Sequence, residues 1–211
     1  TPCGATWAGL QPFSLRDFAT ALQQVHTSTD LRFASGNPHW LVSPHTDQAA
    51  RKRTLIRRWL DAGRIVLLQE THWLDADAAS WEVAFPNAKT LHSTAVAGPR
   101  GGPQGGVAIL LPHGYTALRT RTLAAGCVLE AIVRAPDLSE LRLLSVYLPP
   151  GLQADTLDSW ASAQTHADLP TYIGGDFNMV LGAPRPGEET LVEQLLDLCA
   201  AHFATPVMDP R

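Results

Sequence analysis

Cysteine is scarce in this sequence, which contains only Cys3, Cys127 and Cys199 among its 211 residues. An odd number of widely spaced cysteines builds neither a disulfide framework nor a zinc cluster. The small, disulfide-stabilised secreted domains are therefore excluded as a class. We expect buried, reduced thiols and an intracellular location, with the nucleus as one option.

Long hydrophobic runs and a strong net charge are also missing. No apolar run approaches the roughly 18 residues that a membrane span needs, so we expect no membrane association. The formal net charge of −4 gives no support to nucleic-acid binding through bulk charge, although it is compatible with a local basic patch. The first residues, TPCGATWAGL, lack the basic flank and apolar core of a secretory signal, and the missing initiator Met suggests an excerpt of a longer protein.

The remaining composition is that of an ordinary globular protein, with 45% hydrophobic and 17% charged residues. The length suits one substantial α/β domain, which we place at residues 31–211. Residues 1–30 are interpreted as an irregular lead-in with a short helix that Ser14 would cap. The expected state is a monomer, and the sequence identifies no protein partner.

Hydrophobic patterning predicts strands early in the chain that alternate with helices, followed by a hairpin. This order is typical of a layered α/β domain. The helices are expected between Pro44 and Gly63, at 155–167 and at 188–203, with a helical turn within 71–81. The predicted strands are LRFASGN (31–37), RIVLLQE (64–70), 90–96, VAILLP (107–112), 127–134, 141–148 and 171–180.

A segment rich in Gly and Pro, GPRGGPQGG, occupies residues 98–106. A loop of this composition can hold phosphate, but the segment has no Gly-Lys-Ser/Thr and no G-x-G-x-x-G placed before a helix. We therefore interpret it as a flexible hairpin connection.

The predicted helix that ends before Gly63 has a basic face and an apolar stripe. The stripe consists of Leu55, Ile56, Trp59 and Leu60, and the basic face of Arg51, Lys52, Arg53, Arg57 and Arg58. Such a face is either solvated surface or a contact to a nucleic-acid backbone. The candidates for nucleic-acid binding are Arg51, Lys52, Arg57 and Arg58.

The stretch TYIGGDFNMV (171–180) carries the most chemistry. If its backbone stays extended, Asp176 and Asn178 share one face while Phe177 turns into the core. A carboxylate and an amide displayed together suit a hard cation and a phosphate oxygen. The same residues favour an Asx turn, so this stretch alone leaves both interpretations open.

Three other predicted strands each end on a polar side chain. Asn37 is either a turn residue or part of a site, Glu70 is either a solvated strand end or a cation ligand, and Tyr147 either packs or holds a phosphate oxygen. Ligands of α/β sheets bind beyond strand ends. We therefore expect these residues to converge with Asp176 on one site.

The segments LLQETHW, GGVAILLP, SVYLPPG and YIGGDFN occur in this order. In them the sequence resembles the endonuclease/exonuclease/phosphatase superfamily, and most of all the endonuclease domains of non-LTR retrotransposons, over about residues 31–203. The resemblance implies a deoxyribonuclease I-like fold, which is a two-sheet α/β sandwich with helices on the outer faces. It also implies a phosphodiesterase site for DNA at one rim, dependent on Mg²⁺ with Mn²⁺ as the alternative.

The resemblance also implies a role for each candidate residue. Glu70 would ligate the metal ion, and Asn37 would lie beside it. Asp176 would orient or activate the attacking water. Asn178 would hold the scissile phosphate, and Tyr147 would bind or orient the same group. Such oxygen ligands suit Mg²⁺, and prepositioned donors would meet the charge that develops on the phosphate.

One part of the superfamily pattern does not occur here. In the superfamily a later Ser-Asp-His motif supplies the catalytic His, and this sequence has no such tripeptide. The resemblance therefore implies a C-terminally incomplete domain that lacks its last strands and has weak or no activity. His72 would line the site rather than replace the missing base, and His202 would be structural.

Two further functions stay open. A phosphatase of the same fold could act on a small phosphorylated or lipid substrate, which the acidic net charge favours. A non-catalytic remnant could bind nucleic acid or a partner through the basic segment 51–58. An assay that compares nicking of plasmid DNA with hydrolysis of small phosphate esters distinguishes an endonuclease from such a phosphatase.

Overall fold

The computed structural model describes residues 31–38, 47–98, 101–163, 169–181 and 184–201, together with the backbone of 205–207. Nearly all of these residues belong to one compact unit, Arg32–Arg211. The predicted lead-in at 1–30, Cys3 and His202 lie outside the described residues, so the expectations for them stay predictions. Cys127 and Cys199 are buried and free, as expected.

A four-stranded sheet of order β1-β2-β6-β3 is formed by the first half of the chain. Its strands are β1 (Phe33–Gly36), β2 (Ile65–Leu68), β3 (Lys89–Ser93) and β6 (Val107–Leu111). β1 and β2 are parallel, whereas β6 is antiparallel to both of its neighbours. Every residue of β2 and β6 is buried, which confirms the prediction made from their continuous apolar runs.

A second, five-stranded sheet has the order β11-β10-β9-β8-β7. Its strands are β7 (Thr116–Ala124), β8 (Val128–Arg134), β9 (Glu140–Tyr147), β10 (Thr171–Asp176) and β11 (Thr205–Val207). β8 and β9 form the predicted antiparallel hairpin, and β10 runs parallel to β9. The sequence pattern does not predict β7 or β11.

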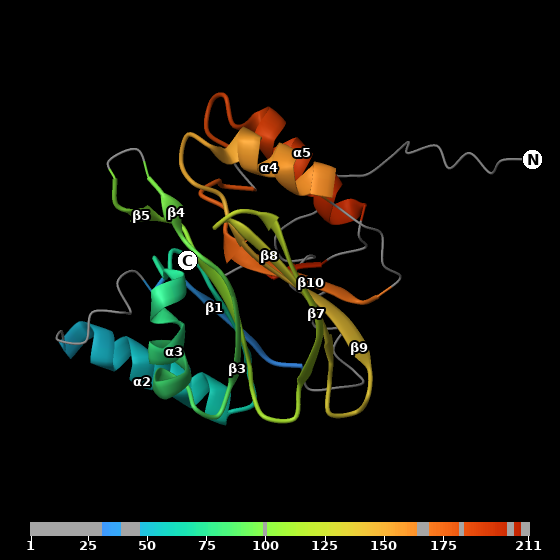
Figure 1. Ribbon diagram of the computed structural model, residues 1–211. Helices are drawn as coiled ribbons and strands as arrows, with labels where there is room; N and C mark the ends of the chain where they lie inside the picture. The colour runs from blue at the N-terminus through green and yellow to red at the C-terminus, as the bar shows by residue number, and fades with distance from the viewer. Residues whose placement is uncertain are drawn as a thin grey trace, which may run out of the picture. The chain divides into compact units, whose positions relative to one another are not determined.

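Helices cover the outer faces of both sheets (Figure 1). The helices α2 (Asp47–Asp61) and α3 (Ala78–Ala84) pack on the first sheet, and α4 (Gln153–Ala163) packs against β7 and α5 (Glu189–Ala200). The apolar cluster under α2 and α3 contains Ile56, Leu60, Val66, Leu68, Trp73, Trp81, Phe85, Ala108 and Leu110. A 3₁₀ turn, η1 (Asp75–Asp77), precedes α3. The domain is thus a two-sheet α/β sandwich, as predicted.

Two close contacts bring the inner faces of the sheets together. The rings of Phe33 on β1 and Tyr172 on β10 stack with their centroids 4.8 Å apart. A Cβ atom added to Gly174 would lie 2.6 Å from the Cδ1 atom of Leu67, so the sheets approach here too closely for any side chain at position 174. β1 and β2 of the first sheet therefore face β10 and β9 of the second.

The segment rich in glycine forms the predicted hairpin. β4 (Val96–Ala97) pairs antiparallel with β5 (Pro103–Gln104), and the glycines 101 and 102 lie in the connection. The hairpin leads directly into Gly105 and Gly106, both of which adopt positive φ angles.

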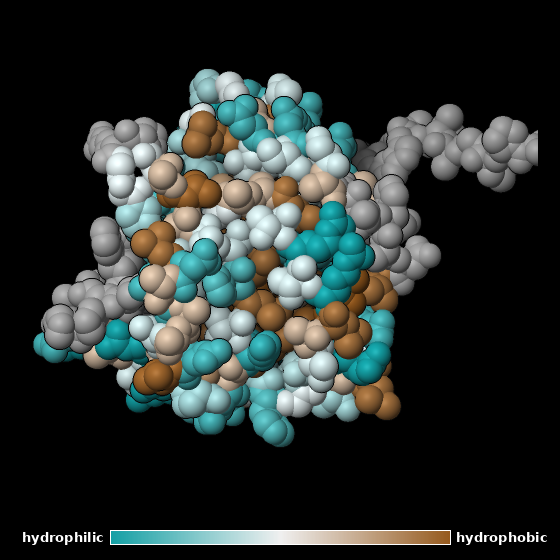
Figure 2. Space-filling model, viewed as in Figure 1, coloured by the Kyte–Doolittle hydropathy of each residue, from teal (hydrophilic) through white to brown (hydrophobic). Residues whose placement is uncertain are grey.

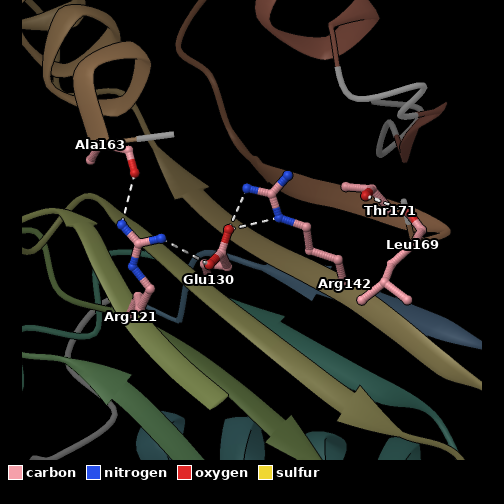
Figure 3. A network of polar contacts seen from close by, with 6 residues as sticks. All are labelled: Arg121, Glu130, Arg142, Ala163, Leu169 and Thr171. Atoms are coloured by element: carbon pink, nitrogen blue, oxygen red, sulfur yellow. Dashed lines mark hydrogen bonds and ion pairs between the residues drawn. The ribbon is translucent and has the colours of Figure 1, made fainter. Parts of the chain in front are cut away.

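A buried ion pair lies on the face of the second sheet that points away from the first (Figure 3). The Nε atom of Arg142 on β9 donates to the Oε2 atom of Glu130 on β8 at 2.7 Å, and the Nη2 atom of Arg142 contacts the same oxygen. The side chains are 0% and 2% exposed, respectively. Arg121 of β7 approaches Glu130 with its Nη1 atom at 3.9 Å and donates from Nη2 to the Ala163 carbonyl of α4 at 2.8 Å. The network therefore ties three strands to a helix.

Two expectations about individual elements are wrong. The strand predicted at 171–180 ends at Asp176, because the Asp-Phe-Asn sequence forms a turn there. Leu55 does not share the burial of Ile56 and Leu60; it is 46% exposed, because the part of α2 that contacts the sheet is narrower than the apolar stripe.

Hydrophobic side chains on the surface are dispersed. Exposed examples include Val83 on α3, Leu118 on β7 and Leu138 in the turn between β8 and β9. On the face drawn in Figure 2, brown hydrophobic residues are interspersed with teal hydrophilic ones. Scattered residues of this kind are ordinary surface and do not mark a binding patch. Within the described part of the chain, none of the helices combines the length and apolarity needed to span a membrane.

Candidate functional site

The candidate residues follow four strands that end at the same rim of the sandwich. Asn37 comes directly after β1, Glu70 lies two residues beyond β2, and Tyr147 and Asp176 are the last residues of β9 and β10. The parallel register pairs Asp176 with Tyr147, and it pairs Gly36 with Leu68 in the other sheet. Parallel strands end at one edge of a sheet, and the facing of the two sheets brings both edges together.

Two hydrogen bonds cross between the sheets at this rim. The Asn37 Nδ2 atom donates to the Asp176 Oδ2 atom at 3.3 Å, across 139 positions of sequence. The phenol of Tyr147 donates to the carboxylate of Glu70. The structure therefore brings together Asn37, Glu70, Tyr147 and Asp176, whose convergence was predicted from the strand ends.

The surroundings of Tyr147 raise the pKa of its phenol well above the ordinary value. Burial is the largest cause, followed by the hydrogen bond to Glu70 and the negative charges of Glu70 and Asp176. Both carboxylates thus act on the same hydroxyl group. The phenol keeps its proton throughout the physiological pH range, so Tyr147 is a hydrogen-bond donor in this site and not a base.

Glu70 is positioned by a strained turn. Glu70 and His72 have φ angles of 48° and 56°, a region that residues other than glycine seldom adopt. The turn is held by backbone bonds from Thr71 N to the Gly106 carbonyl at 3.0 Å and from His72 N to the Gly105 carbonyl at 2.9 Å. Strained backbone of this kind is concentrated at functional sites.

The turn requires glycine beneath it. A Cβ atom on Gly106 would lie 2.5 Å from the Thr71 Oγ1 atom, and one on Gly105 would lie 2.6 Å from the Gly126 carbonyl oxygen. The end of the glycine-rich segment is therefore a close-packed support for Glu70, a role that its interpretation as a flexible connection missed. The signal in the sequence was the pair of adjacent glycines just before a buried strand.

Asn178 occupies a turn of its own. The Asp176 Oδ1 atom accepts a hydrogen bond from the Asn178 backbone N–H at 3.2 Å, which is an Asx turn. The Asn178 Nδ2 atom donates to the Leu148 carbonyl at 3.0 Å, and the φ angle of Asn178 is 49°. Asp176 therefore both forms an Asx turn and lies at the rim with the other candidate residues. Asn178 lies beyond the end of β10, so it does not share a strand face with Asp176. Phe177 is buried, as predicted.

The donor atoms at the rim suit a hard cation. Glu70 and Asp176 provide carboxylate oxygens, and Asn37 provides an amide whose nitrogen donates to Asp176. Mg²⁺ is bound in proteins by few carboxylates and keeps several waters. Among residues whose placement is described, no group of three or more His, Cys, Asp or Glu is arranged to hold a metal ion. The oxygen atoms at the rim are of the kind that a hard divalent cation takes as ligands.

The basic face of α2 is partly engaged in structure. Lys52 donates from Nζ to the Pro38 carbonyl at 2.7 Å, and Arg57 donates from Nε to the Ala84 carbonyl at 2.8 Å. Arg51 and Arg58 are exposed. Lys52 thus fastens α2 to the residue that follows Asn37, beside a cavity of about 210 Å³ between α2 and the end of β1. The exposed arginines are the part of this face that is available to a phosphate backbone.

The sequence profile of the Endonuclease/Exonuclease/phosphatase family matches residues 31–188, which include all four strand ends of the site. The chain belongs to this family. No curated protein sequence matches the chain.

Solved structures show the same fold at low sequence identity. The endonuclease domain of TRAS1, a telomere-specific non-LTR retrotransposon, is 17% identical with a TM-score of 0.54, over 80% of this chain and 72% of that one. The AP endonuclease LMAP from Leishmania major is 12% identical with a TM-score of 0.53, over 81% and 66% of the two chains. An AP endonuclease from Archaeoglobus fulgidus is 14% identical with a TM-score of 0.52, over 80% and 70%. These similarities establish the deoxyribonuclease I-like fold.

Proposed function

We propose that this domain is a phosphodiester hydrolase that depends on a divalent metal, nicks DNA and is of retroelement origin. The observation that carries the proposal is the pair of hydrogen bonds between the sheets, Asn37 to Asp176 and Tyr147 to Glu70. They gather two carboxylates, an amide and a protonated phenol at one rim. The likeness to nuclease structures, and to a retrotransposon endonuclease among them, supports the choice of substrate and lineage.

Each residue has a specific task in this proposal. A Mg²⁺ or Mn²⁺ ion bound by Glu70 and neighbouring oxygens would polarise the phosphoryl group and stabilise the leaving alkoxide. Asp176, held by the Asn37 amide, orients the attacking water and accepts its proton. Tyr147 shifts its hydrogen bond from Glu70 to a phosphate oxygen when substrate binds.

Asn178 retains a donor for the phosphate. Its side-chain nitrogen carries two N–H groups, and the Leu148 carbonyl accepts one of them. We assign the second N–H to a phosphate oxygen. The sequence has no Ser-Asp-His motif to supply a catalytic His, so low turnover is expected and metal binding is the more sensitive readout.

Replacing Glu70 with Gln is expected to weaken Mn²⁺ binding by more than about 100-fold, since loss of a residue that only supports a metal ligand already costs about 10- to 100-fold. The amide oxygen of Gln can still accept the Tyr147 hydroxyl, so the fold should persist. Isothermal titration calorimetry measures the affinity. Nicking of supercoiled plasmid with excess protein should fall in parallel.

The matched control for this substitution is Glu82→Gln, an equal change of charge at an exposed position on α3. It should leave Mn²⁺ affinity and nicking unchanged. Equal affinity in Glu70→Gln and the unchanged protein would refute the assigned metal site.

The exposed arginines of α2 give a second prediction. Replacing Arg51 and Arg58 together with Glu should weaken DNA binding and make the slope of log K against log salt shallower by about two, because each phosphate contact contributes about one. Fluorescence anisotropy with a labelled duplex over a range of salt concentrations provides the measurement. Arg57 is left unchanged because its bond to Ala84 would mix a structural effect into the result.

The control for the arginine variant carries the same charge change on two strands, as Lys89→Glu on β3 with Arg119→Glu on β7, both exposed. It should leave the slope unaltered. If both double variants lose DNA affinity equally, the effect is one of overall charge, and α2 is ordinary solvated surface.

A phosphatase of the same fold is the alternative function, favoured by the net charge of −4. A panel of inositol phosphates and soluble phosphomonoesters, assayed beside plasmid DNA with Mg²⁺, separates the two. Release of phosphate from the panel without nicking would replace the nuclease proposal.

A further inference from the structure

A layer of polar side chains lies directly behind the site, between the two sheets. Its centre is Gln69, which is 1% exposed and immediately precedes Glu70. The Gln69 Nε2 atom donates to the Ser145 hydroxyl on β9 at 3.1 Å, and the Oε1 atom accepts from the Ser35 hydroxyl on β1 at 3.2 Å. The Ser145 hydroxyl donates in turn to the Leu68 carbonyl on β2 at 3.1 Å.

The position of this layer follows from strand geometry. Residues two apart on a strand share a face, so Ser35 lies one step behind Asn37, Ser145 behind Tyr147 and Gly174 behind Asp176. Gly174 has no side chain because Leu67 fills its place. The layer thus underlies the site residues of both sheets.

Polar side chains are unusual between two packed sheets, because this space ordinarily holds apolar side chains from both inner faces. Burying an amide and two hydroxyls gains little net stability even when every bond is made. Such bonds differ from apolar contacts in being directional, because their strength falls steeply when the atoms move apart or out of line. This layer therefore holds the two sheets at one spacing and one offset.

We propose that Gln69 is a positioning residue: by bridging Ser35 and Ser145 it sets the distance between the sheets so that Asn37 and Glu70 of one reach Asp176 and Tyr147 of the other. Gln69 also anchors the start of the strained turn, since its backbone N–H donates to the Gly36 carbonyl at 3.1 Å. This inference rests on the proposed function, because it concerns the geometry of the same site.

The test replaces Gln69 with Met, which has similar length and volume but no amide. Mn²⁺ affinity measured by calorimetry is expected to fall about 10-fold, as for other residues that orient metal ligands. In the metal-free protein, the side-chain amide signals of Asn37 in the ¹H–¹⁵N spectrum should shift, because its bond to Asp176 lengthens. In nicking with excess protein, the rate at saturating protein should fall while the protein concentration for half-maximal rate stays the same.

A control variant separates positioning from lost stability. Val133→Ala removes buried volume from β8 at the end of the second sheet away from the site, where Val133 pairs with Leu141 at the start of β9. It should lower the urea midpoint at least as much as Gln69→Met, yet leave Mn²⁺ affinity and the Asn37 signals unchanged. Equal effects of the two variants on metal affinity would overturn the inference.

A triple variant provides the second discrimination. Ser35→Ala, Gln69→Met and Ser145→Ala together remove the whole layer and leave no hydroxyl of it without a partner, so the urea midpoint should recover towards that of the unchanged protein. Metal affinity should stay low. Recovery of both would mean that the layer only contributes stability.

The outcomes also separate this inference from the proposed function. If Glu70→Gln abolishes Mn²⁺ binding and Gln69→Met leaves it intact, the metal site stands and the positioning role fails. If Glu70→Gln has no effect on binding, the proposed function itself fails.

Discussion

Asp176→Asn is expected to lower the rate of DNA nicking by about 10²- to 10⁴-fold, the usual contribution of a general base. The Asp176 carboxylate accepts from Asn37 through Oδ2 and from the Asn178 backbone through Oδ1. An amide in its place keeps the shape but loses basicity and one of the two acceptor atoms. Single-turnover nicking of supercoiled plasmid with Mn²⁺ and excess protein gives the rate.

Folding must be measured beside the rate of this variant. One lost acceptor should lower the free energy of unfolding by about 1 kcal/mol, which leaves the domain folded. The matched control is Asp197→Asn on the exposed side of α5, which should change neither quantity. A nicking rate within twofold of the unchanged protein would remove Asp176 from the mechanism.

The largest loss of stability is expected at the buried ion pair. Glu130→Ala removes the buried carboxylate that the guanidinium of Arg142, which is 0% exposed, contacts through Nε and Nη2. Breaking a buried pair by removing one member costs about 3–5 kcal/mol, because an uncompensated charge stays in the interior. Urea unfolding followed by circular dichroism measures the loss.

The exposed pair on the same two strands is the natural control. Arg134 donates to Glu140 at 2.8 Å, and their side chains are 45% and 39% exposed. Glu140→Ala should cost less than about 1 kcal/mol, as surface pairs do. Similar losses for Glu130→Ala and Glu140→Ala would show that burial does not set the energy of this pair.

Replacing both members of the buried pair tests whether the loss of stability in Glu130→Ala comes from leaving one charge buried without its counter-charge. Glu130→Leu with Arg142→Met removes both charges and retains volume, and such exchanges are often neutral or stabilising by about 1–4 kcal/mol. We expect the double variant to be more stable than Glu130→Ala. A double variant as unstable as the single one would contradict the explanation that a buried charge without its counter-charge causes the loss.

Local sequence predicted those strands whose residues are all buried to the same extent. β2 and β6 are buried at every position, so their apolar runs were unambiguous. β7 (TALRTRTLA) escaped prediction because most of its side chains are exposed and its alternation is weak. The strand towards Asn178 ended early at Asp176, because the local turn preference of Asp and Asn prevailed over strand continuation.

The candidate site was predictable in part for a similar reason. Polar residues that directly follow apolar runs were visible as strand ends, and the resemblance gave them roles. The sequence did not show that Gln69, one residue before Glu70, is buried and bridges the sheets. Its partners lie 34 and 76 positions away, at Ser35 and Ser145, and each serine by itself has no distinguishing feature.

The order of residues along the chain was enough to predict strands that end on oxygen-bearing side chains, and glycines where the backbone must turn or approach closely. Those properties depend on neighbours in the chain and on the period of the local backbone. How the strand ends meet, which amide faces which carboxylate, and why the pKa of the Tyr147 phenol lies above its ordinary value emerged from the folded arrangement. Those properties depend on the packing of two sheets, and the residues that set it are distant in sequence and near in space.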